Sequence, residues 1–129
     1  MKRWVKIQSE PIDEPALLQS RKISRGIGAV VHFLGTVRDQ ENADQITALE
    51  YEAFSEMAMH QFHKIFDEVE RRWPVESIRL VHRIGMIAVS TPSLWVEITA
   101  PHRAEAFAAC QYLIDEMKQL VPIWKKPVR

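Results

Sequence analysis

The sequence predicts an α+β fold in which about three helices pack on a largely antiparallel sheet. Two segments, 55–73 and 101–121, repeat apolar residues at helical spacing. Short segments rich in β-branched residues, bounded by glycine or proline, lie before and between them. The resulting order is β-α-β-β-α-β-β-α with an extended tail, which is typical of helices packed on antiparallel strands.

The N-terminal part predicts two strands and a short helix. Residues 4–8 alternate loosely between apolar and polar and indicate a first strand. The acidic residues 13–14 favour the start of a helix over 16–23, because negative charge stabilises a helix N-terminus. The apolar, β-branched run 29–34 continues to Arg38 and predicts a strand covered on both faces.

The middle of the chain predicts another strand and a long helix. Residues 39–45 are polar and indicate a loop, and 46–53 alternate as a half-buried strand that we expect to pair with the previous one. The helix over 55–73 has Ser55 as its expected N-cap, and Pro74 ends it.

The C-terminal part predicts two more strands and the last helix. Residues 77–84 and 94–99 indicate the strands, with a short extended segment at 86–89 between them. Pro101 begins the helix and Pro122 ends it, so the tail beyond Pro122 is expected to be extended.

The composition is that of one ordinary globular domain, 1–129, with 47% hydrophobic and 26% charged residues. Seventeen basic residues balance seventeen acidic ones, which disfavours a generic polyanion-binding protein. A single cysteine leaves no intramolecular disulfide and no cysteine zinc cluster. The sequence has no signal peptide and no run of 18 apolar residues, so we expect a cytoplasmic protein.

Several cationic residues are candidates for binding an anion. Arg38 follows a predicted strand and could hold a phosphate or carboxylate, although a surface salt bridge is the commoner role. His102 and Arg103 begin a helix, where cations are unfavourable unless an anion offsets them. Lys118 lies on the flank of the last helix, where a lysine is more often simply solvated.

Other polar residues are weaker candidates. The acidic and histidine side chains of the 55–73 helix lack the spacing of a known metal motif. His32 and His82 lie among apolar strand residues, as core histidines do. Cys110 lies on the core face of the last helix and predicts a buried, inert thiol. We therefore expect no metal site and no cofactor.

Three segments closely resemble one known family in their order and spacing. They are Phe33-Leu34-Gly35-Thr36-Val37-Arg38, then Ala100-Pro101-His102-Arg103 leading into Ala106-Phe107, and residues 113–126 (LIDEMKQLVPIWKK). The family is the large, catalytic subunit of molybdopterin synthase. Residues 49–54 and 82–85 match the same family, so the resemblance extends from about residue 4 to 126.

The resemblance implies an α+β enzyme of molybdenum cofactor biosynthesis. Members of this family convert cyclic pyranopterin monophosphate into molybdopterin by installing two sulfurs as a dithiolene. The sulfur arrives as a thiocarboxylate on the C-terminal glycine of a small ubiquitin-like subunit, whose tail enters a pocket of the large subunit. The resemblance further implies a homodimer of large subunits with a small subunit at each end, which makes a heterotetramer.

The resemblance also implies roles for individual residues. Lys118 and Lys125 match the functional lysines of the family, so we expect them to orient the donor carbonyl and to transfer protons. Arg38, His102 and Arg103 are the expected ligands of the substrate phosphate. All five side chains should then face one pocket.

Two further expectations concern the walls of that pocket. In an extended tail, Lys125 and Lys126 lie on opposite faces, so we expect Lys125 in the pocket and Lys126 in solvent or facing a partner. Phe33 and Met117 could form a wall beside the pterin, although core packing is the stronger interpretation of both.

The sequence departs from the family in two places. The loop 39–45 lacks the glycine common in relatives, so its conformation is expected to differ. Pro127 stands where many relatives have an acidic residue and a further segment, and contacts of that segment would be absent or supplied from elsewhere.

The alternative function is a non-catalytic α+β module that binds a phosphorylated ligand or an acidic protein tail.

Overall fold

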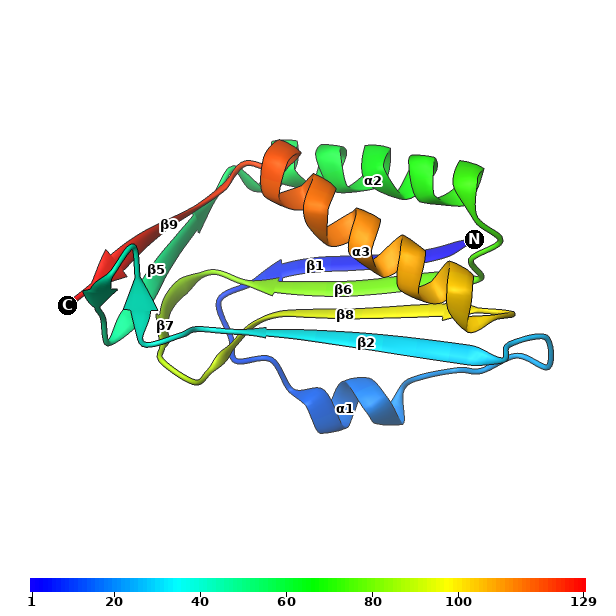
Figure 1. Cartoon of the computed structure of the whole chain (residues 1–129), viewed down its shortest axis with the longest axis horizontal. Coiled ribbons are helices and arrows are strands. Elements are labelled where there is room, and N and C mark those ends of the chain that lie inside the picture. Colours follow the sequence, from blue (N-terminus) through cyan, green and yellow to red (C-terminus); the bar gives the residue numbers. More distant parts are fainter.

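Four strands form the main sheet, in the order β1-β6-β8-β2 (Figure 1). The computed structural model describes all residues, 1–129. The bounds of these strands are Lys2–Gln8 for β1, Ala29–Thr36 for β2, Ser77–Arg83 for β6 and Pro92–Ala100 for β8. β1 runs parallel to β6, and the other two pairs are antiparallel. The prediction of a largely antiparallel α+β fold is therefore confirmed.

A second, three-stranded sheet lies at the end of the main sheet that is far from the N-terminus (Figure 1). Its central strand is β5 (Ala48–Ala53), which pairs with β7 (Gly85–Ala88) and β9 (Ile123–Val128). The prediction that this strand pairs with β2 is wrong, because β8 occupies the inner side of β2 from Ala29 to Thr36. The chain leaves β2 through a small hairpin, β3 (Gln40–Glu41) and β4 (Asp44–Gln45), in the segment predicted as a loop.

Two long helices cover one face of the main sheet, and a short helix lies on the other (Figure 1). The long helices are α2 (Ser55–Arg72) and α3 (Arg103–Leu120), and the short one is α1 (Glu14–Gln19). The predicted apolar stripes of α2 and α3 are buried, and they join residues of β6 and β8 in one core of 19 buried residues. The helical periodicity therefore identified the core face of both helices. Neither helix is long and apolar enough to cross a membrane.

The helix starts differ from the predicted ones. Phe54, not Ser55, is the N-cap of α2, and no side chain caps that end. Helix α1 begins at Glu14 because the Asp13 side chain accepts a hydrogen bond from the Ala16 N–H, at 3.1 Å, and Pro15 occupies the first turn. The segment 20–23, predicted as helix, lies beyond its end.

Strand β2 is an edge strand with one open face, so the prediction that it is covered on both faces is wrong. Val31 and Phe33 pack against the core below α3. His32 and Leu34 alternate with them and are exposed, because α1 is too short to cover the opposite face. A β-branched run bounded by glycines does not distinguish an edge strand from a central one.

A charged network fastens α1 to the sheet. The carboxylate of Glu97 in β8 is 1% exposed and accepts two hydrogen bonds from Arg79 of β6, at 2.8 and 3.0 Å. Arg79 also donates to the Leu17 carbonyl at the end of α1, at 2.8 Å. Burial by itself would raise the pKa of Glu97, but Arg79 and His32 outweigh it and hold that pKa below its ordinary value.

Candidate active site

A cavity of about 600 Å³ lies where the C-terminal end of α3 meets the two sheets. This volume is within the range of small-molecule sites, roughly 300–1,000 Å³. Half of the residues that line the cavity are apolar and come from both sheets and from α3. They are Phe33, Leu34, Leu49, Tyr51, Leu94, Met117, Val121 and Ile123. The cationic residues of the lining are Arg38, Lys118 and Lys125, and its one acidic residue is Glu41.

Arg38 enters the cavity from the segment that follows β2. The register between β2 and β8 shifts at Gly35 and Thr36, and the next residue, Val37, is 2% exposed. Burial of Val37 in the small cluster with Ile46 and Ile87 fixes the backbone just before the arginine. Arg38 itself is exposed and forms no ion pair within the chain.

Lys118 enters from the last turn of α3. Met117 is buried at 6% exposure and anchors this turn in the core, so its neighbour Lys118 is directed to the flank that borders the cavity. A cation is electrostatically favoured there, because the C-terminal end of a helix carries partial negative charge. Pro122 prevents the helix from continuing, and the chain turns into β9.

Lys125 enters from β9. Strand β9 pairs with β5 so that Lys125 lies opposite Tyr51, and Lys126 lies opposite Glu50. Tyr51 and Lys125 both line the cavity, whereas Lys126 does not. The structure thus separates the two lysines as the alternation of a strand requires. The Nζ of Lys125 is 3.0 Å from the Oε1 of Glu41 in the β3-β4 hairpin.

His82 is a lining residue that the sequence interpretation assigned to the core alone. It is 5% exposed and packs edge-on against Tyr51, with ring centroids 5.2 Å apart. Its Nδ1–H donates to the Arg83 carbonyl at 2.8 Å. Burial lowers the pKa of His82, so its ring stays neutral at pH 7. Nothing in the alternating pattern around His82 distinguishes a core histidine from one at a cavity wall.

His102 and Arg103 lie elsewhere in this chain, contrary to the expected convergence of all five polar residues. They are at the N-terminal end of α3, and Lys118 is 15 residues further along, about 22 Å at the rise of an α-helix. The His102 side chain is 78% exposed, and its Nδ1 is 3.6 Å from the Oε1 of Glu105. The single chain therefore brings Arg38, Lys118 and Lys125 together but leaves His102 and Arg103 outside.

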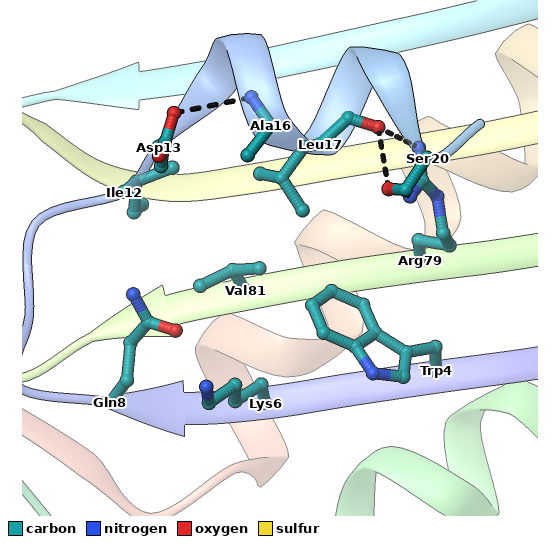
Figure 2. A pocket seen from close by; sticks show the side chains of 10 residues that line it. All are labelled: Trp4, Lys6, Gln8, Ile12, Asp13, Ala16, Leu17, Ser20, Arg79 and Val81. Atoms are coloured by element: carbon teal, nitrogen blue, oxygen red, sulfur yellow. Dashed lines mark hydrogen bonds between the residues drawn. The ribbon is translucent and has the colours of Figure 1, made fainter.

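A second cavity, about 460 Å³, lies between α1 and the strands β1 and β6 (Figure 2). None of the predicted site residues lines it. Figure 2 shows Trp4 and Lys6 on β1, with Val81 and Arg79 of β6 between them and the α1 segment. Since Arg79 is bound to Glu97, Leu17 and Ser20, its donors are used within the protein. Besides Arg79, Lys6 is the one cationic residue of this lining, so this cavity lacks the cluster of three cations that lines the first.

Known proteins match this chain over most of its length. A family model described as "MoaE protein" matches residues 7–120, which is most of the chain. The chain belongs to the MoaE protein family. A MoaE relative from Thermoplasma volcanium, named molybdopterin synthase catalytic subunit, is 37% identical over 125 residues, which cover 97% of this chain and 90% of the relative.

Solved structures resemble this MoaE family member as well. The molybdopterin synthase structure from Staphylococcus aureus has a TM-score of 0.86 and 37% identity, over 95% of this chain and 88% of the other. A complex of subunits 1 and 2 of molybdopterin-converting factor from Helicobacter pylori has a TM-score of 0.79 over 96% of this chain and 88% of the other. Its identity is 22%, so it supports the fold alone. The family gives the chain an enzyme role in molybdopterin synthesis, as the sequence motifs indicated.

Proposed function

We propose that the 600 Å³ cavity is the site at which sulfur passes from the C-terminal thiocarboxylate of a small ubiquitin-like subunit to cyclic pyranopterin monophosphate. The observation that carries this proposal is the meeting of Arg38, Lys118 and Lys125 from three separate elements at one cavity. Both ligands are anions that repel one another. Three cationic side chains reduce that repulsion and let the two ligands approach.

The polar residues have distinct tasks in this reaction. The thiocarboxylate sulfur forms a C–S bond to a substrate carbon, which loses an oxygen substituent, so the tail and the substrate are joined as a thioester. Water then adds to the donor carbonyl carbon, negative charge develops on its oxygen, and the acyl C–S bond breaks, which leaves the sulfur on the substrate and an ordinary carboxylate on the tail. Lys118 and Lys125 orient that oxygen and donate protons. Arg38, whose planar guanidinium suits a phosphate, binds the cyclic phosphate. Two such transfers, each from a fresh donor tail, produce the dithiolene of molybdopterin.

The apolar wall has the task of binding the pterin. Phe33 and Met117 each contact the main core and also line the cavity. Core packing and substrate binding are therefore compatible roles for both side chains. A wall of this kind excludes water from the reacting sulfur and strengthens the electrostatic effect of the lysines.

We infer that His102 and Arg103 serve the cavity of a second copy in a homodimer. They are too far along α3 to serve the cavity of their own chain. With a small subunit at each end, the assembly is a heterotetramer.

The test is reconstitution with a thiocarboxylated small subunit and cyclic pyranopterin monophosphate. Lys118→Ala and Lys125→Ala should each reduce dithiolene formation by about 10²–10³-fold, the usual loss for a donor that stabilises developing charge. Binding of the small subunit, measured by calorimetry, should be partly retained. Lys126→Ala is the matched control, since it removes the same charge from the opposite face of β9 and should keep near-normal activity.

Two results would contradict the proposal. Full activity in both Lys118→Ala and Lys125→Ala would refute the role of the lysines. Binding of the small subunit by the unaltered protein without any sulfur transfer would favour the non-catalytic binding module.

A further inference from the structure

The carboxylate of Glu41 is an unexpected component of a cavity for anions. Glu41 is the only acidic residue among the lining residues, and its side chain is 16% exposed although it belongs to a surface hairpin. Its Oε1 is 3.0 Å from the Nζ of Lys125. It therefore occupies the position at which a carboxylate, thiocarboxylate or phosphate oxygen of a ligand would meet that lysine.

The hairpin that carries Glu41 is held in place with some strain. Its two-residue turn consists of Asn42 and Ala43, both left-handed, with φ of 52° and 69°. This turn type favours glycine, and a left-handed alanine costs about 1–2 kcal/mol. Such a conformation persists only where other contacts hold it.

Three contacts hold this hairpin. The Ile46 N–H donates to the Asp39 carbonyl at 2.9 Å, closing its base, and Ile46 itself is buried. The other two contacts are ion pairs with the C-terminal segment: Glu41 with Lys125 of β9, and Asp44 with Arg129, which follows the end of β9, at 2.8 Å. The two acidic residues thus bind two basic residues of the same C-terminal segment, but only the Glu41–Lys125 pair lies in the cavity.

The ion pair at the cavity has a direct effect on ligand binding. With Glu41 ionised, the three cations of the lining are offset by one negative charge, which leaves a net charge of two. An anion that takes the position of the Glu41 carboxylate on Lys125 must separate the two residues. Small inorganic anions bring few other contacts to compensate for that loss, whereas a ligand that also contacts the apolar wall and Arg38 brings several.

We propose that Glu41 is a specificity-determining residue that occupies the anion position on Lys125 and gives way to the anionic group of a cognate ligand. This inference rests on the proposed function only in taking the ligand to be an anion. The shared chemistry is an oxyanion or thiocarboxylate, which either the donor tail or the substrate phosphate provides. Glu41 also holds Lys125 toward the cavity while no ligand is bound.

The test compares Glu41→Gln with Asp44→Asn. Each replacement removes one carboxylate charge from the hairpin and nearly keeps its shape. Two ligands are titrated separately at low ionic strength, where surface ion pairs are least screened. One is the small subunit ending in an ordinary carboxylate, followed by calorimetry, and the other is inorganic phosphate, followed by NMR shifts of β9. Thermal unfolding of all proteins checks that the fold is retained.

Glu41→Gln should bind at least one of the two ligands about 2-fold to 5-fold more tightly than the unaltered protein, the factor expected for loss of a partly exposed ion pair. The ligand that gains affinity is the one that takes the place of Glu41. Asp44→Asn should bind both ligands as the unaltered protein does. A gain of affinity is diagnostic, because loss of a purely structural contact would weaken binding.

The proposal is overturned if Glu41→Gln binds neither ligand more tightly, or if Asp44→Asn changes affinity as much as Glu41→Gln does. These binding measurements need no turnover, so they are independent of the proposed reaction. Tighter binding by Glu41→Gln together with a lack of sulfur transfer in the unaltered protein would refute the reaction while retaining the role of Glu41. Normal sulfur transfer by the unaltered protein, with no gain of affinity in Glu41→Gln, would support the reaction and refute the role of Glu41.

Discussion

Burial determines the protonation chemistry of individual residues in this chain. Cys110 is 5% exposed on the core face of α3, and burial raises the pKa of its thiol to about 11. Such a thiol stays protonated at neutral pH and is a poor nucleophile. The sequence interpretation of Cys110 as a buried, inert side chain agrees with this environment.

His82 predicts a pH dependence of stability. Its pKa is lowered by burial in the folded chain and is about 6.5 when unfolded. Below pH 6.5 the unfolded state therefore binds more protons, and stability falls as the pH falls. His82→Asn, which retains a donor for the Arg83 carbonyl, should lack this contribution. Between pH 6.5 and 5.5 the free energy of unfolding should fall more steeply in the unaltered protein, by up to about 1.4 kcal/mol per pH unit.

Chemical denaturation at several pH values measures this difference. Because every other titrating group is common to both proteins, the difference between their two pH profiles reports His82 alone. Parallel profiles for the two proteins would show that His82 gains no proton on unfolding in this range.

At the scale of elements, the attachment of α1 depends on a buried ion pair. Arg79→Met should leave the Glu97 carboxylate without its main partner, at a cost of about 3 kcal/mol in the free energy of unfolding. It also removes the bond to the Leu17 carbonyl, so amide hydrogens of α1 should exchange faster. The double variant Arg79→Met, Glu97→Met removes the unpaired charge and should recover much of that stability.

Denaturant titration of the single and double variants checks this prediction, and hydrogen exchange checks α1 directly. A single variant as stable as the unaltered protein would contradict it. So would a double variant less stable than the single one, because then the packing of the arginine and not its charge would be the important contribution.

The elements that local sequence patterns determine could be predicted, and those that depend on distant partners could not. The apolar stripes of α2 and α3 and the prolines at 74 and 122 fixed both helices, because these are local signals. The predicted pairing of the strand 46–53 with the previous strand was wrong, since strand pairing is a contact between distant segments. Glu41 was missed because a glutamate in a polar loop carries no signal of the lysine, 84 residues further along, that it binds.

The residues of the candidate site also differ in how far the sequence could predict their positions. The family resemblance singled out Lys118 and Lys125, and alternation along a strand then separated Lys125 from Lys126. Both chosen lysines line the cavity, although the pattern around Lys118 alone favoured a solvated side chain. The position of His102 and Arg103 at the start of a helix was also correct. Their convergence with the lysines failed within one chain, because the length of α3 separates them from Lys118.

At the scale of the whole molecule, the shared-site proposal predicts complementation between inactive variants. Lys125→Ala and Arg103→Ala should each be nearly inactive. In a mixed dimer of the two, one cavity combines an intact Lys125 with an intact Arg103, and the other combines both replacements. Random mixing makes half of the dimers mixed, with one good site of two in each. Mixed and refolded proteins should therefore show about one quarter of normal activity.

Dithiolene formation by the mixture, compared with each variant alone, measures this effect. If Arg103 acts in its own chain or is dispensable, the mixture will be no more active than the average of the two separate proteins. A mixture of Lys118→Ala with Lys125→Ala is the matched control, because both residues come from the same chain. That mixture should gain nothing from mixed dimers.

The pairing of β9 with β5 has one more consequence, which concerns errors in strand alignment. A slip of one residue would exchange the two faces of β9 and place Lys126 where Lys125 belongs, so the charge of the cavity would survive the mistake. The slip would still be unfavourable, because it would also turn the indole of Trp124 inward. In the correct alignment that indole packs edge-on against Phe54, with ring centroids 5.5 Å apart. The packing of these two exposed aromatic rings outside the cavity therefore favours the correct alignment, which the two lysines alone would not distinguish from the slipped one.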